Sequence, residues 1–128
     1  MSIIQISEFT KKVMQQINKI PAGQVATYKQ IAELAGKPQG SRGVAWILHS
    51  CSTTYKLPWH RVINSKGKIS FEVGTHNFRK QKKNLENEGI VLASDGQLSL
   101  AKFQWKKRAS VRKSKNEPQI FSKRKSND

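Results

Sequence analysis

The chain has 128 residues, of which 36% are apolar, and this size and composition fit one small globular domain with a modest core. It carries 24 Lys and Arg residues against 8 Asp and Glu, and the net charge of +16 favours a polyanionic partner such as nucleic acid. One cysteine excludes an internal disulfide, the three histidines show no metal-ligand spacing, and no apolar stretch approaches the roughly 20 residues of a membrane span.

The basic charge is spread over two parts of the chain. Residues 1–105 are predicted to form the folded domain, and residues 106–128, with nine basic and two acidic side chains, a disordered tail. The tail either adds nonspecific attraction to phosphate or acts as a solubilising extension. The N-terminus lacks a signal-peptide pattern. We therefore expect an intracellular protein of the cytoplasm or nucleoid, or of a eukaryotic nucleus, with no membrane partner, metal or cofactor.

Two helices are predicted near the N-terminus. The first has apolar residues at three- and four-residue intervals, namely Ile6, Phe9, Val13, Ile17 and Ile20. Ser7 is placed to cap its start, and residues 21–23 are placed to end it. The second helix begins with a T-x-x-Q capping box at Thr27 and ends at Gly36.

A third helix is predicted after the turn at residues 37–40, with Ser41 as its N-cap. Its inner face holds Val44, Ile47, Leu48 and Cys51. Its opposite face holds Arg42, Ala45, Trp46 and His49. The two short helices and the four-residue turn between them indicate a helix-turn-helix, and the opposite face is the one we expect to meet DNA.

The second half of the chain is less apolar. Residues 75–88 are predicted to form a fourth helix, stopped by Gly89. Residues 90–92 and 98–100 flank a turn at 94–96, a pattern typical of a small hairpin or wing. Phe103 and Trp105 are expected to pack the end of the domain onto its core.

Three motifs occur in the order and at the separations found in the O6-alkylguanine-DNA alkyltransferases. Residues 20–28, IPAGQVATY, resemble the family's I-P-x-G-x-V-x-T-Y, residues 42–44 resemble the start of its recognition helix, and residues 58–62, PWHRV, resemble its P-C-H-R-V active-site loop. Trp59 stands where those enzymes have the alkyl-accepting cysteine, and an indole cannot act as that nucleophile. The chain therefore resembles the alkyltransferase-like proteins, which bind alkylated DNA without repairing it.

The resemblance implies a mainly α fold with a small β-hairpin, a compact winged helix-turn-helix that enters the minor groove and flips the damaged nucleotide. In that family a residue at the position of Tyr28 turns the nucleotide by its phosphate, and one at the position of Arg42 fills the hole. Read without the family, Tyr28 is a packing residue and Arg42 a solvated cation. The predicted DNA-binding and base-flipping set is Tyr28, Ser41, Arg42, Gly43, Ala45 and Trp46. Small residues in it suit a close approach to the narrow groove.

The predicted lesion pocket consists of Tyr28, Pro58, Trp59 and Val62. Trp59 either closes an obsolete pocket or forms one wall of a working one, and the second interpretation is favoured because Tyr28 and Arg42 are retained. The loop over the pocket, in the region of residues 70–77, matches the family poorly, which leaves the range of adducts open.

No catalytic residue is predicted. In the enzymes the residues matching His60 and Glu88 relay the thiol proton, and without a thiol they are expected to remain as a structural hydrogen-bond pair. Arg61 is expected to form an internal ion pair, and Cys51 to be a buried small residue.

The leading hypothesis is therefore a nonenzymatic sensor, a monomer that binds double-stranded DNA carrying O6-alkylguanine. By family resemblance it would flag the lesion for the damage-recognition proteins of nucleotide-excision repair. Two other hypotheses remain open: a winged-helix regulator that reads undamaged sequence, and residual alkyl transfer through Cys51 or hydrolysis through His60.

Overall fold

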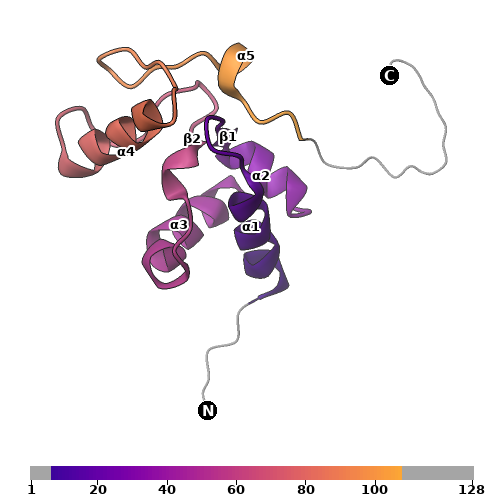
Figure 1. Cartoon of the computed structure of the whole chain (residues 1–128). Coiled ribbons are helices and arrows are strands. Elements are labelled where there is room, and N and C mark those ends of the chain that lie inside the picture. Colours follow the sequence, from indigo (N-terminus) through magenta and orange to yellow (C-terminus); the bar gives the residue numbers. More distant parts are fainter. Residues whose placement is uncertain (1–6, 108–128) are drawn as a thin grey trace, which may run out of the picture.

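Helices and one very short sheet make up the described part of the molecule, residues 7–107 of a computed structural model (Figure 1). In chain order the elements are α1 (Glu8–Lys19), β1 (Ala26–Thr27), α2 (Tyr28–Leu34), α3 (Ser41–Tyr55), the 3-10 turn η1 (Trp59–Arg61), β2 (Val62–Ile63), α4 (His76–Asn87) and α5 (Leu100–Phe103). The four helices predicted from the sequence are all present, as α1, α2, α3 and α4. The mainly helical fold is confirmed.

Side-chain caps explain where most of the helices begin. The Ser7 hydroxyl accepts a hydrogen bond from the Thr10 N–H at 3.0 Å, and Thr75 caps α4 in the same way. At α2, Thr27 and Gln30 form the complete capping box that the sequence predicts.

The predicted cap of α3 is wrong by one residue. Gly40, not Ser41, is the N-cap, and its carbonyl accepts from the Val44 N–H at 3.0 Å. A side chain at Gly40 would crowd Phe9, because an added Cβ would lie 2.9 Å from its ring. The N-cap of α3 is therefore a glycine packed closely against α1, and it caps the helix without a side-chain hydrogen bond.

The β structure differs from the predicted hairpin. The turn at residues 93–96 forms, with the Gly96 N–H donating to the Ala93 carbonyl at 2.9 Å. Beyond it, however, the chain pairs with a distant segment, since Gln97 forms an antiparallel bridge with Lys68. Leu100 then enters α5, which is capped by the Ser99 hydroxyl. A helix cap and a long-range partner thus outweigh the local hairpin pattern.

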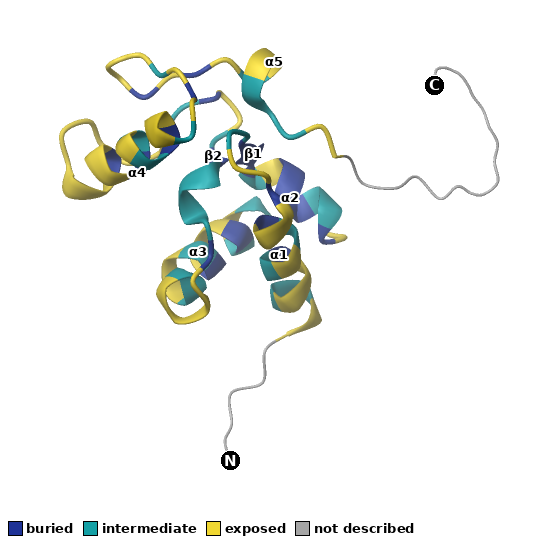
Figure 2. Ribbon diagram, viewed as in Figure 1, coloured by how far each residue is buried: buried dark blue, intermediate teal, exposed yellow. Residues whose placement is uncertain are grey.

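The only sheet among the described residues is a parallel pair, with Ala26 opposite Val62 and Thr27 opposite Ile63. Successive strand residues point to opposite faces. Accordingly, Ala26 and Val62 join a core cluster built from α1, α2 and α3, whereas Val25 and Ile63 join a second cluster with Phe78 and Leu85 of α4. The sheet lies between these two apolar clusters, and the helices separate to either side of it in Figures 1 and 2.

The end of the described chain is fastened to the helix-turn-helix. The backbone of Val25 exchanges hydrogen bonds with Phe103 and Trp105, at 2.9 and 2.7 Å. The buried Gln30 amide donates to the carbonyls of Trp105 and Lys107 at 2.8 and 2.9 Å. Phe103 and Trp105 also pack against the cores, as predicted. The predicted tail lies outside the described residues from position 108 onward. Within residues 7–107, no helix is long and apolar enough to cross a membrane.

Candidate nucleic-acid interface

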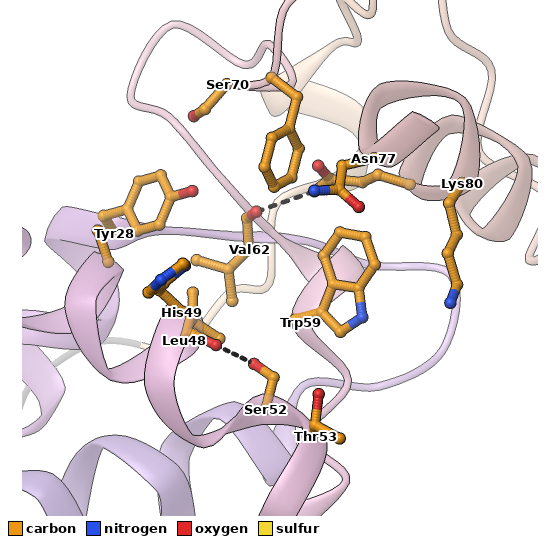
Figure 3. Close-up of a pocket in the computed structure, with 13 residues that line it drawn as sticks. Tyr28, Leu48, His49, Ser52, Thr53, Trp59, Val62, Ser70, Asn77 and Lys80 are labelled. Atoms are coloured by element: carbon orange, nitrogen blue, oxygen red, sulfur yellow. Dashed lines mark hydrogen bonds between the residues drawn. The ribbon is translucent and has the colours of Figure 1, made fainter. Parts of the chain in front are cut away.

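A cavity of about 490 Å³ opens between α2, α3, η1 and α4 (Figure 3). Its lining consists of Tyr28, Ala45, Leu48, His49, Ser52, Thr53, Trp59, Val62, Ser70, Phe71, Asn77, Lys80 and Gln81. The size suits one flat, partly apolar group of the dimensions of a nucleobase, since small-molecule pockets begin at roughly 300 Å³.

Trp59 forms a wall of this cavity and does not fill it. It is the first residue of η1 and is half-buried, and its ring meets the edge of Phe71 at a centroid separation of 6.0 Å and an interplanar angle of 89°. Its other aromatic neighbour is His60, at 6.4 Å and 88°. Edge-to-face contacts on two sides hold the indole in place and leave space beside it.

Three of the four residues predicted for the pocket line it, and Pro58 does not. Tyr28 lies at the start of α2, half-buried against the first core, and the buried Val62 forms part of the base of the cavity (Figure 3). Pro58 precedes η1 as its N-cap, and its carbonyl accepts from the Arg61 N–H at 3.1 Å. Pro58 therefore stabilises the turn that carries Trp59.

The outer face of α3 leads directly to the cavity. Arg42, Ala45, Trp46 and His49 are exposed on this face, Trp46 to 67%, and Ala45 and His49 also line the cavity. Arg42 precedes Ala45 by three residues, less than one helical turn, which amounts to roughly 5 Å along the axis. An arginine therefore stands next to the mouth of the cavity, free of any ion pair within residues 7–107.

Gly43 is half-buried where α3 packs against α1. A Cβ added there would meet the Phe9 ring at 3.1 Å, so the close approach of α1 also favours a small residue at this position. Its predicted approach to a DNA groove stays a prediction. Ser41, the first residue of α3, is half-buried.

Behind Trp59, a cluster of polar groups anchors η1 to the rest of the protein. The Glu88 carboxylate accepts hydrogen bonds from Arg61 at 2.7 to 3.2 Å and from the Gly23 N–H at 3.0 Å, and it bonds His60 Nε2 at 2.8 Å. Arg61 also donates to the Ile20 carbonyl at 3.0 Å. We call this group the Glu88 clamp; it joins the end of α1, the turn after it, η1 and the end of α4.

The Glu88 clamp keeps its carboxylate ionised. Burial alone would raise the pKa of Glu88, but hydrogen bonds from Arg61, His60 and Gly23, together with the electrostatic attraction of His60, lower that pKa from 4.5 to about 2. The carboxylate is thus a fixed anion that orients His60 and Arg61. It lies close behind the turn that carries Trp59.

Sequence reasoning missed the contribution of α4. Gln81 is buried and donates to the carbonyls of His60 and Val62 at 3.0 and 3.1 Å, which fixes η1 from a second side. Asn77, Lys80 and Gln81 all line the cavity. Their i, i+3, i+4 spacing places them on one face of a helix, and this polar face is the signal that could have found them.

Cys51 lies outside the cavity lining. The thiol is half-buried, packs against the first core and does not line the cavity. Within the described chain, no group of three or more His, Cys, Asp or Glu side chains is placed to hold a metal ion.

Comparison with known proteins gives consistent matches. Residues 8–90 match the family model described as the DNA-binding domain of 6-O-methylguanine DNA methyltransferase. Over 100 residues the chain is 40% identical to the DNA base-flipping protein of Vibrio parahaemolyticus, covering 78% of this chain and 98% of that protein. Over 107 residues it is 35% identical to alkyltransferase-like protein 1 of Schizosaccharomyces pombe, covering 80% and 99%.

Solved structures agree with these matches. The crystal structure of S. pombe Atl1 in complex with damaged DNA containing O6-carboxymethylguanine has a TM-score of 0.70 and 36% identity, covering 81% of this chain and all of that one. Mycobacterium tuberculosis O6-methylguanine methyltransferase gives 0.56 and 25%, covering 76% and 55%. The extent of the family match and the identity to full-length relatives show that this chain belongs to the alkyltransferase-like family, which shares the DNA-binding domain of the O6-methylguanine-DNA methyltransferases.

Proposed function

We propose that this protein is a nonenzymatic sensor of alkylated DNA, which binds duplex through the minor groove and flips O6-alkylguanine into the cavity beside Trp59. The observation that carries the proposal is the open cavity with Tyr28 on one side, Trp59 on another and Arg42 next to its mouth. A guanine O6 inside a duplex cannot reach a protein pocket while the base is stacked and paired. An extruded base would enter beside Ala45, and Arg42 is placed to occupy the gap.

The cavity lining contains no thiol to accept an alkyl group. The indole of Trp59 cannot form a thiolate, and the only cysteine of the sequence, Cys51, packs against the core. The Glu88 clamp, which holds His60 against a carboxylate, has no thiol proton to accept. We therefore assign it a structural role in fixing Trp59.

A labelled-duplex experiment tests this function. Excess protein is mixed with duplex carrying O6-[methyl-³H]guanine, bound and free DNA are separated, and the label is located after the protein is digested. We expect the labelled duplex to be retained by protein and all the label to stay on the DNA. Label on protein, or released as methanol, would show chemistry and would overturn the sensor proposal.

Replacing the pocket wall should weaken lesion binding specifically. Trp59→Ala removes the ring against which the flipped base would lie, and base–aromatic contacts are worth about 1–3 kcal/mol. We expect about 20-fold weaker binding to O6-methylguanine duplex and little change for undamaged duplex, measured by fluorescence anisotropy. Trp59→Phe, which keeps an aromatic face, is the matched control and should lose far less. Equal losses for both variants would argue against a wall contact.

The proposals about oligomeric state, location and repair partners rest on family resemblance. We propose that the bound protein acts as a monomer in the intracellular compartment that holds the DNA, and that damage-recognition proteins of nucleotide-excision repair read the complex. A complex without a covalent step has a lifetime set by dissociation alone, which suits a flag for a second protein.

A further inference from the structure

The lining of the cavity includes a basic side chain and no acidic one. None of its lining residues is an aspartate or glutamate, whereas Lys80 and His49 are both among them. Glu72, which adjoins the lining residue Phe71, is exposed and does not line the cavity. The charged group of the lining is therefore a cation, and the partial charges beside it come from hydroxyl, amide and imidazole groups.

Lys80 is available to a ligand. It is exposed on the cavity side of α4 and forms no ion pair with any described residue, whereas the nearby Lys82 is bound to Glu86 at 2.7 Å. Figure 3 shows the Lys80 side chain running past the Trp59 ring, with its amino group on the side of the ring that carries the indole nitrogen. Lys80 therefore brings a positive charge to the lining of the cavity.

Two further donors line the same cavity. The indole N–H of Trp59 has no hydrogen-bond partner within residues 7–107, although the ring is half-buried and contacts Phe71 and His60. The Thr53 side chain also lines the cavity (Figure 3). An ammonium, an indole N–H and a hydroxyl in a lining without acidic side chains form a set of donors for an anion.

From this arrangement we infer that Lys80 makes the pocket selective for O6-adducts that end in a carboxylate. The inference rests on the proposed function and names the adduct class that the site favours. A carboxylate entering a pocket loses hydration, which is costly unless charge-assisted hydrogen bonds replace it. Lys80 and the indole N–H supply such bonds, and a neutral adduct of the same size gains much less from them.

Two isosteric adducts test the inference. Duplexes carrying O6-carboxymethylguanine, O6-carbamoylmethylguanine, O6-methylguanine or unmodified guanine are titrated with wild-type protein, Lys80→Met and Lys83→Met. Lys83 lies on the same helix, is exposed and does not line the cavity, so its variant matches the change in net charge. We expect wild type and Lys83→Met to bind the carboxymethyl duplex about five-fold more tightly than the carbamoylmethyl duplex, and Lys80→Met to lose most of this preference.

The outcomes separate the two proposals. Equal wild-type affinity for the charged and neutral adducts, or a ratio unchanged in Lys80→Met, would overturn the role of Lys80 while the sensor function stood, provided that O6-methylguanine is bound more tightly than guanine. Loss of the ratio in Lys83→Met as well would assign it to net charge and would also overturn the inference. Wild-type protein that binds all four duplexes equally would contradict the sensor function itself.

Discussion

Arg42→Ala should weaken binding to O6-methylguanine duplex about 100-fold and leave binding to undamaged duplex nearly unchanged. A single exposed phosphate contact contributes little at physiological salt. Filling the gap left by a flipped base contributes more, because unstacking a base step costs a few kcal/mol that an inserted side chain offsets. The exposed position of Arg42 near the mouth of the cavity suits that role.

Two variants make the Arg42 result specific. Lys12→Ala removes one positive charge from the exposed face of α1 and should weaken damaged and undamaged binding by the same small factor. Arg42→Lys keeps the charge without the planar guanidinium and should recover only part of the loss. Affinities come from fluorescence anisotropy of labelled duplexes. If Arg42→Ala weakened both duplexes alike, Arg42 would be a phosphate contact and the flipping role would be wrong.

Glu88→Gln should destabilise the fold by about 2–3 kcal/mol at neutral pH, because it leaves the Arg61 guanidinium and His60 without their anion. The folded pKa of Glu88 is about 2, below its ordinary value of 4.5, so its ionised form stabilises the folded state. That contribution is complete above pH 4.5 and is lost as the pH falls toward 2. The difference between wild type and variant should therefore shrink across this range.

The measurement is urea unfolding followed by circular dichroism at several pH values. Glu86→Gln is the matched control, since Glu86 lies on the same helix and pairs with Lys82 in an exposed contact at 2.7 Å. Such a surface pair contributes about 0.5 kcal/mol or less. A loss in Glu88→Gln no larger than that in Glu86→Gln would show that the Glu88 clamp does not stabilise the fold.

The helices could be predicted because their signals are local. Thr27 and Gln30 sit within one turn of each other, and Ser7 and Thr75 precede clear helical segments. The parallel strands could not be predicted in this way, because Ala26 and Val62 are far apart in sequence. They meet only after α2 and α3, which separate them along the chain, pack against each other. Of the predicted hairpin at residues 90–100 only the turn forms, with the Ala93 N–H donating to the Gln97 carbonyl at 2.8 Å, because Gln97 also pairs with the distant Lys68.

The site also combines features with a local sequence signal and features that depend on long-range packing. A motif identifies Trp59, and the family pattern names Tyr28 and Arg42. The polar face of α4 is visible in the sequence, but its spacing does not say that this face lines the cavity. Lys80 and Gln81 reach it because Phe78 and Leu85 of α4 share the second core with Ile63 of β2, the strand that directly follows η1. At Gly43 the sequence suggests approach to a groove, and the position of Phe9 adds a packing reason for its small size that no sequence pattern reveals.

If this protein recognises the damaged base itself, its affinity must depend on a single alkyl group. The measurement is the Kd for two matched duplexes that differ only by one O6-methyl group, at physiological salt. A damaged base is easier to extrude than an undamaged, fully paired base, and once extruded it can contact the cavity lining. We therefore predict binding at least about 10-fold tighter to the damaged duplex. Equal affinity for the two duplexes would contradict the account and would favour a winged-helix protein that reads undamaged DNA.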